Sequence, residues 1–183
     1  ILQLLQKGFQ VHTTIRSLSK KEHIIEALTH AGAEPAGRLY FFEADLTADG
    51  GWEAAMEGVT YVLHVASPFP AQDPADENEL IIPARDGALR VLRAAKAAGV
   101  KRVVLTSSFA AVGYSIDPKD HIFTEADWTD AQVPLPAYIK SKTVAEKAAW
   151  HFINEEGGEM ELTVINPVGI FGPSIGGISS ASL

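Results

Sequence analysis

The chain has 183 residues, 46% of them hydrophobic, which is enough to bury the core of one domain. Its 15 Lys and Arg residues against 23 Asp and Glu residues give a net charge of −8, which disfavours nucleic-acid and anionic-membrane partners. No apolar run has the length of a membrane span, and the absence of cysteine excludes disulfides, thiolate metal sites and a Cys nucleophile. These features predict a cytoplasmic protein with no nucleic-acid or membrane partner.

The apolar residues follow a pattern in which short strands alternate with helices. A long irregular stretch over 115–136 is predicted to be functional or covered by a partner segment. In chain order we expect the end of a helix over 1–8, a strand over 9–15, a helix over 20–31, a strand over 39–44, a helix over 51–57, a strand over 61–66, a helix over 77–98, a strand over 102–106, a helix over 137–155 and a strand over 162–167.

Apolar strands separated by helices are typical of a parallel sheet that is buried on both faces. The sequence therefore predicts an α/β fold with a doubly wound parallel sheet, Rossmann-like. The first eight residues have the pattern of the end of a helix, and no closing helix follows the last strand. We therefore expect the sheet to be incomplete at both ends of the chain.

Candidate site residues follow from the rule that ligands of such sheets bind beyond the carboxyl ends of the strands. Tyr138 and Lys142 are four residues apart, so they share one face of their predicted helix, although a solvent-exposed helix face would give the same spacing. The hydroxyls of Thr106, Ser107 and Ser108 lie where a predicted strand ends. Together these groups suit carbonyl–alcohol interconversion, because a phenol can move the proton and a nearby ammonium stabilises its anion.

At this point the chain resembles a known family, the extended short-chain dehydrogenases/reductases. Within that superfamily it is most similar to the dihydroflavonol reductase, cinnamoyl-CoA reductase and aldehyde/ketone reductase branch. The resemblance spans essentially the whole chain, and the segments that carry it are Asp45-Leu46, His64 to Pro68, Arg102 to Ser108, Tyr138-x-x-x-Lys142, and Asn166-Pro167 through Gly172-Pro173.

The resemblance implies a catalytic set of Ser108, Tyr138 and Lys142, with Ser107 as the alternative serine. It also implies a cofactor site, in which Asp45 and Leu46 contact the adenine, while for the Val and Pro positions plain packing is an equal alternative. The implied cofactor-binding residues are Arg16, Asp45, Leu46, Val65, Ala66, Ser67, Thr106, Tyr138, Lys142, Pro167 and Val168.

Arg16 stands where this fold distinguishes between the two nicotinamide cofactors. An acidic residue there binds the ribose 2′-OH of NAD, whereas an arginine accommodates the 2′-phosphate of NADP. We therefore expect NADPH rather than NAD. The family's first strand with its Gly-rich turn and its C-terminal substrate lobe have no counterpart here, so residues 1–183 are expected to form part of a dinucleotide-binding domain.

The predicted function is NADPH-dependent reduction of a small-molecule carbonyl to an alcohol. The alternatives are a nucleotide-sugar epimerase or dehydratase with the same triad, and a non-catalytic nucleotide-binding module. The resemblance also implies a homodimer. The histidines give no metal site, and His64 is expected to be a core or near-cofactor residue; Phe69, Tyr114 and Ile116 are candidates for the wall of the substrate site.

Overall fold

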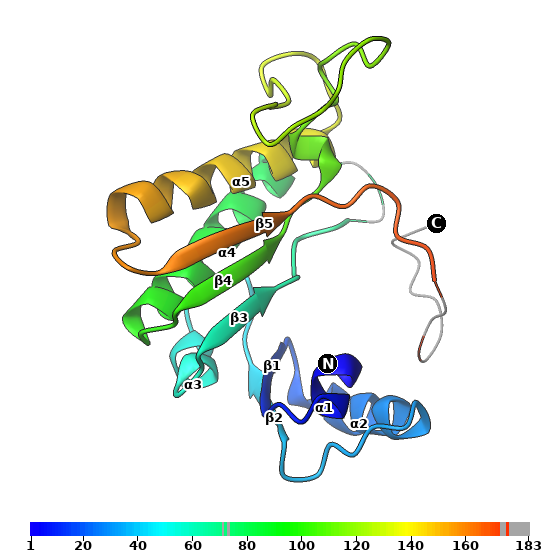
Figure 1. Ribbon diagram of the computed structural model, residues 1–183, viewed down its shortest axis with the longest axis vertical. Coiled ribbons are helices and arrows are strands. Elements are labelled where there is room, and N and C mark those ends of the chain that lie inside the picture. Colours follow the sequence, from blue (N-terminus) through cyan, green and yellow to red (C-terminus); the bar gives the residue numbers. More distant parts are fainter. Residues whose placement is uncertain (71, 73, 173–174, 176–183) are drawn as a thin grey trace.

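The predicted alternation of helices and strands is confirmed in the computed structural model, which describes residues 1–70, 72, 74–172 and 175 (Figure 1). No helix in these ranges is long and apolar enough to cross a membrane. The elements are α1 (Leu2–Gln6), β1 (Val11–Ile15), η1 (Leu18–Lys20), α2 (Lys21–His30), β2 (Leu39–Glu43), α3 (Trp52–Met56), β3 (Tyr61–His64), α4 (Asn78–Ala97), β4 (Arg102–Thr106), η2 (Phe109–Ala111), α5 (Ala137–Glu156) and β5 (Glu161–Ile165), where η marks a 3-10 helix.

The strands form two parallel sheets rather than one. β1 pairs with β2, with Val11 opposite Leu39, and the larger sheet has the order β3-β4-β5, with Arg102 opposite Glu161. A doubly wound sheet of six strands has the order 3-2-1-4-5-6. The observed strands correspond to 3-2 and 4-5-6 of that order, so the split lies where the sequence predicts that the first strand is lacking.

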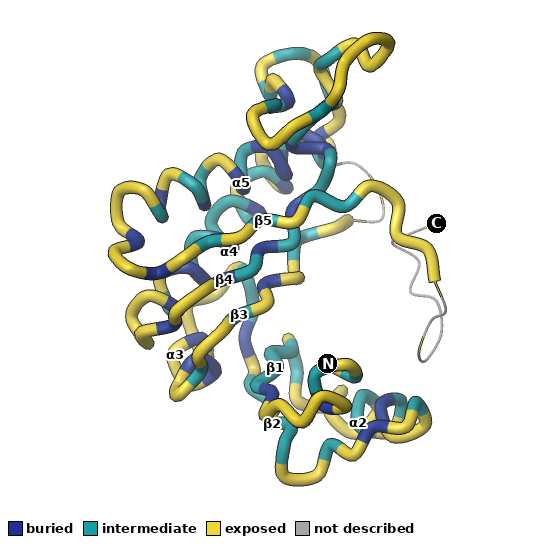
Figure 2. The backbone as a smooth tube through the Cα atoms, viewed as in Figure 1, coloured by how far each residue is buried: buried dark blue, intermediate teal, exposed yellow. Residues whose placement is uncertain are grey.

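Helices α4 and α5 pack against each other and cover one face of the larger sheet (Figure 1). Their apolar residues join α3 and β4 in the main core, which includes Val91, Leu92, Val103 and Phe152. The opposite face is open (Figure 2), with Tyr61 61% and Leu63 53% exposed. The prediction of a sheet buried on both faces is therefore wrong for β3. Alternate residues of a strand point to opposite faces, and no helix in the described ranges covers the face that carries Tyr61 and Leu63.

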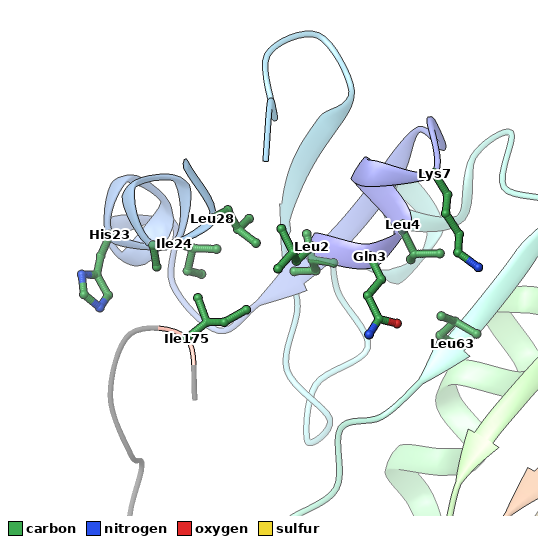
Figure 3. A pocket seen from close by; sticks show the side chains of 11 residues that line it. Leu2, Gln3, Leu4, Lys7, His23, Ile24, Leu28, Leu63 and Ile175 are labelled. Atoms are coloured by element: carbon green, nitrogen blue, oxygen red, sulfur yellow. The ribbon is translucent and has the colours of Figure 1, made fainter. Parts of the chain in front are cut away.

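The smaller sheet has a core of its own with α1 and α2, built from Leu5, Val11, Leu28 and Ala33. A cavity of about 640 Å³ opens between α1, α2 and Leu63 of β3 (Figure 3). Its lining is mostly apolar and includes none of the residues predicted to bind cofactor or substrate.

The segment after β2 is held in place by three residues. Trp52 Nε1 donates to the carbonyl oxygens of Asp45 at 3.2 Å and Ala48 at 3.0 Å. The Arg90 guanidinium pairs with Asp49 at 2.5 Å and donates to the Leu46 carbonyl. Gly51 makes the close approach possible, since it has a φ of +86° and a Cβ there would lie 1.9 Å from the Glu43 carbonyl oxygen.

We expect Gly51→Ala to lower the free energy of unfolding by about 3 kcal/mol, because overpacking against backbone adds to left-handed strain. Gly58→Ala is the matched control, since Gly58 has a φ of +70° but open space around a Cβ, and it should lose only about 1 kcal/mol. Urea unfolding followed by tryptophan fluorescence measures both. Equal losses in the two variants would contradict the close contact at Gly51.

Candidate functional site

The first two turns of α5 carry the phenol and the ammonium that the sequence singles out. Lys142 is only 8% exposed, and its Nζ lies 5.6 Å from the centre of the Tyr138 ring. Phe69 meets the same ring edge to face, with 5.0 Å between the ring centres. The structure thus brings Tyr138 close to a buried cation and to an aromatic ring that the sequence had suggested as a wall of the substrate site.

Burial determines the protonation states of Lys142 and of the neighbouring His64. It lowers the pKa of Lys142 to about 8, and no neighbouring charge contributes to that shift. His64 at the end of β3 is buried as predicted, and its pKa falls to about 4, first through burial and then through the nearby charge of Lys142. At neutral pH the site therefore holds a charged Lys142 beside a neutral His64.

The two serines after β4 have different surroundings. The Ser108 Oγ accepts a hydrogen bond from the Ala110 N–H at 3.1 Å and so caps η2. The Ser107 Oγ is buried and, among the described residues, has no hydrogen-bond partner. A buried hydroxyl without a partner costs free energy, so it is a natural contact for a bound ligand.

Helix η2 brings this turn against α5. The Thr143 Oγ1, which is fully buried, donates to the Ile139 carbonyl at 3.0 Å and lies 3.5 Å from the Ala110 carbonyl oxygen. Because Thr143 directly follows Lys142, this contact places the serine turn beside the part of α5 that carries Tyr138 and Lys142.

The irregular stretch over 115–136 is confirmed as irregular and is anchored at the same point. The Thr129 N–H donates to the Ala111 carbonyl at 2.9 Å, and the Thr129 Oγ1 accepts from the Tyr114 N–H at 2.9 Å. Trp128 packs under the Lys147 ammonium of α5, with 5.2 Å between Nζ and the ring centre. The stretch is thus fixed to both elements of the candidate site.

Two residues near the site were missed by the sequence analysis. The Asn166 Nδ2 donates to the Ser108 carbonyl at 3.1 Å and to the Glu146 Oε2 at 2.7 Å, and Glu146 is only 5% exposed. Asn166 was named only as part of a segment that carries the family resemblance. The available signal for Glu146 was its spacing, because it continues the series of Tyr138 and Lys142 at steps of four along one helix face.

Arg16 and Asp45 lie at the carboxyl ends of β1 and β2, in the smaller sheet. Asp45 accepts hydrogen bonds from the Thr47 hydroxyl at 2.7 Å and the Thr47 N–H at 2.8 Å, and these bonds, followed by the charges of Arg16 and Arg90, lower its pKa. Arg16 itself is exposed. The structure therefore places these two residues near each other at the end of the smaller sheet, apart from Tyr138 and Lys142 on α5.

The remaining predicted cofactor residues follow the strand ends. Val65 is 66% and Val168 80% exposed, so plain packing does not explain either residue. Ala66 is also exposed, whereas Leu46, Ser67, Thr106 and Pro167 are half-buried. The Pro167 carbonyl accepts from the Phe109 N–H at 2.9 Å, which joins the turn after β5 to the serine turn.

Comparison with known proteins identifies the relatives of this chain. Over residues 1–180 it matches the 3-beta hydroxysteroid dehydrogenase/isomerase family. It is 40% identical to an anthocyanidin reductase ((2S)-flavan-3-ol-forming) of Vitis vinifera, with 94% of this chain and 52% of that protein covered. It is 38% identical to cinnamoyl-CoA reductase CAD2 of Medicago truncatula, with 93% and 53% covered.

Among solved structures it resembles the yeast methylglyoxal/isovaleraldehyde reductase Gre2 complexed with NADPH, with a TM-score of 0.80, 34% identity, and 94% of this chain and 54% of that one covered. The chain thus spans about half the length of the relatives it matches. These relatives confirm the reductase branch that the sequence motifs indicated. Because the match extends over nearly the whole sequence, the chain belongs to the 3-beta hydroxysteroid dehydrogenase/isomerase family.

Proposed function

We propose that the intact protein is an NADPH-dependent reductase that converts a small carbonyl compound to an alcohol. The observation that carries this proposal is the buried Lys142 ammonium beside the Tyr138 ring, next to the serine turn. Relatives that cover nearly all of this chain are named as reductases, which supports the same reaction class.

Tyr138 donates the proton that the carbonyl oxygen needs as it becomes an alcohol. A phenol with a pKa near ~10 is a weak acid, so its anion needs stabilisation. The Lys142 ammonium provides that stabilisation over a short distance in surroundings of low dielectric. The Ser108 hydroxyl donates a hydrogen bond to the same substrate oxygen, with Ser107 as the alternative.

NADPH supplies the hydride in this reaction. The chain's residues fit this cofactor, because the unpartnered Ser107 hydroxyl and the buried Lys142 ammonium lie near the carboxyl end of β4, where a polar ligand would satisfy them. Arg16 would hold the 2′-phosphate, and Asp45 and Leu46 the adenine. The other strand-end residues would border the ribose and nicotinamide: Val65, Ala66, Ser67, Thr106, Tyr138, Lys142, Pro167 and Val168.

This function makes residues 1–183 part of a dinucleotide-binding domain, in which the sheet ends bind the cofactor. The homodimer and the cytoplasmic location stay predictions. An epimerase or dehydratase would use the same triad but return the hydride within each turnover, so the two reactions differ in whether NADP⁺ accumulates.

The first test uses the intact protein with NADPH and two probe carbonyls, methylglyoxal and isovaleraldehyde. We expect NADP⁺ to form in proportion to alcohol, and Tyr138→Phe to lower kcat by about 10²–10⁴-fold, since it removes the general acid. Tyr61→Phe is the control, because this tyrosine is exposed at the start of β3, at the opposite end of the strand from the candidate site. Cofactor fluorescence should show that the Tyr138 variant still binds NADPH. Full activity of that variant would refute the proposed role of Tyr138, and alcohol formation without NADP⁺ would refute the redox reaction.

The second test follows the pH dependence. Lys142 is charged below its pKa and neutral above it, so the reduction rate should fall as the pH rises through about 8. Lys142→Arg should shift this fall in the reduction rate to higher pH, because a guanidinium stays charged. Lys147→Arg, on the exposed side of the same helix, should leave the profile unchanged. If the reduction rate of Lys142→Arg fell at the same pH as that of wild type, a group other than Lys142 would be responsible for the fall.

The third test concerns cofactor choice. Arg16→Ala should raise the KM for NADPH by about 10-fold or more and leave the KM for NADH nearly constant, because only NADPH carries the 2′-phosphate. Arg93→Ala is the control, since Arg93 is exposed on α4 away from the strand ends. An equal change in both KM values would contradict the assignment of Arg16 to the 2′-phosphate.

A further inference from the structure

We propose that Glu146 is a positioning residue that, through Asn166, fixes the serine turn to the helix that carries Tyr138 and Lys142. The proposal rests on the proposed function, because its purpose is the relative placement of these three groups. Nothing in the motifs of the sequence assigns a role to Glu146.

The contacts form one continuous chain between three segments. Asn166 stands directly after β5, and its side-chain amide has two N–H donors. One donates to the Ser108 carbonyl at 3.1 Å, at the end of β4, and the other to the Glu146 Oε2 at 2.7 Å, on α5. Both donors are therefore used, and each reaches a different element of the site.

The contribution of Glu146 is the link to α5. The turns after β4 and β5 are already joined by backbone bonds, from the Ser107 N–H to the Ile165 carbonyl at 2.8 Å and from the Phe109 N–H to the Pro167 carbonyl at 2.9 Å. Neither bond involves α5. The Glu146 carboxylate connects this joined pair of turns to the helix, one turn beyond Lys142.

The burial of Glu146 makes its carboxylate dependent on the hydrogen bond from Asn166. A carboxylate that is 5% exposed loses most of its hydration, so it persists in the interior only with good partners. The bond from Asn166 is charge-assisted and short, whereas the second bond, from the Trp150 Nε1, is 3.4 Å long. Asn166 is thus the main partner of this buried carboxylate.

A hydrogen-bonded link of this kind matters for rate because proton transfer needs close alignment. A displacement of about 1 Å in a reacting group can cost about 10²-fold in rate. If α5 shifted relative to the serine turn, Tyr138 and Ser108 would no longer reach the same substrate oxygen. Cofactor contacts at β1 and β2 would be unaffected, because Arg16 and Asp45 lie on the other sheet.

The test compares substitutions in the intact protein, with methylglyoxal and NADPH as probes. Glu146→Ala should lower kcat by about 10-fold or more and raise the dissociation constant for NADPH by a clearly smaller factor, because the contacts at β1 and β2 stay in place. Glu146→Gln should recover most of kcat, because its carbonyl oxygen still accepts from Asn166. Glu155→Ala is the control, since it removes an exposed carboxylate from the same helix.

A second set of variants exchanges the positions of the Glu146 carboxylate and the Asn166 amide, and it tests the link even if Glu146→Ala does not fold. Asn166→Asp faces the Glu146 carboxylate with a second carboxylate and should lower kcat in the same way. In the double variant Glu146→Gln with Asn166→Asp, the new amide donates to the new carboxylate, so kcat should recover in part. This recovery would show that Glu146 acts through Asn166, and equal unfolding midpoints of the single and double variants would exclude an effect through stability alone.

A measurement without turnover separates this proposal from the proposed function. The side-chain amide protons of Asn166, observed by NMR, should exchange slowly in wild type and in Glu146→Gln, where the hydrogen bond persists, and faster in Glu146→Ala. If the wild-type protein reduces no carbonyl probe, the proposed function fails. The exchange rate of the Asn166 amide protons then tests the hydrogen bond to Glu146 by itself. The role of Glu146 would be overturned if Glu146→Ala kept the kcat of wild type or lost kcat and NADPH binding in parallel. It would also be overturned if the double variant showed no recovery of kcat, or if Glu146→Ala left the exchange of the Asn166 amide protons unchanged.

Discussion

The parallel pairing of β4 with β5 is the constraint on which the candidate site depends. In this register Thr106 lies opposite Ile165, so both strands end at the same height and their following turns meet. Backbone bonds then continue past the strands, and the serine turn, Asn166 and Pro167 become neighbours although more than fifty residues separate them in sequence. Helix α5, which leads into β5, packs back against η2 and brings Tyr138 and Lys142 to the same edge.

Burial of a positive charge gives this edge its chemical character. An isolated ammonium is costly in a medium of low dielectric, and burial accordingly lowers the pKa of Lys142. The neighbouring His64 is neutral at physiological pH and therefore adds no second positive charge. The protein thus holds a cation close to Tyr138, and the ring of Phe69 packs edge to face against the same tyrosine.

Local patterns were enough to predict the helices and strands but not how the strands assemble. Apolar spacing placed α4 and α5 correctly, because a helix shows its period within a few turns. The split between β1 and β3 and the open face around Leu63 depend on which elements cover which sheet, and strand periodicity carries no such information. Tyr138 and Lys142 were found because their spacing falls within one helix, whereas the contact of Glu146 with Asn166 joins residues from separate elements and appears only in three dimensions. The motifs favoured Ser108 and left Ser107 as the alternative, and only the structure shows that the two serines differ in burial and in hydrogen bonding.

The division into two cores has a consequence for cooperativity. The smaller core draws its buried residues from positions 5 to 33, and the larger core from positions 44 to 160, so each is built from its own stretch of chain. Units of this kind can open independently, with free energies of their own. Arg16 is in the first unit and Tyr138 in the second, so a ligand that contacted both would be bound only when both units are folded. Binding energy would then add to the contacts that α3 makes with β1 and β2, and the two folding equilibria would be coupled more strongly.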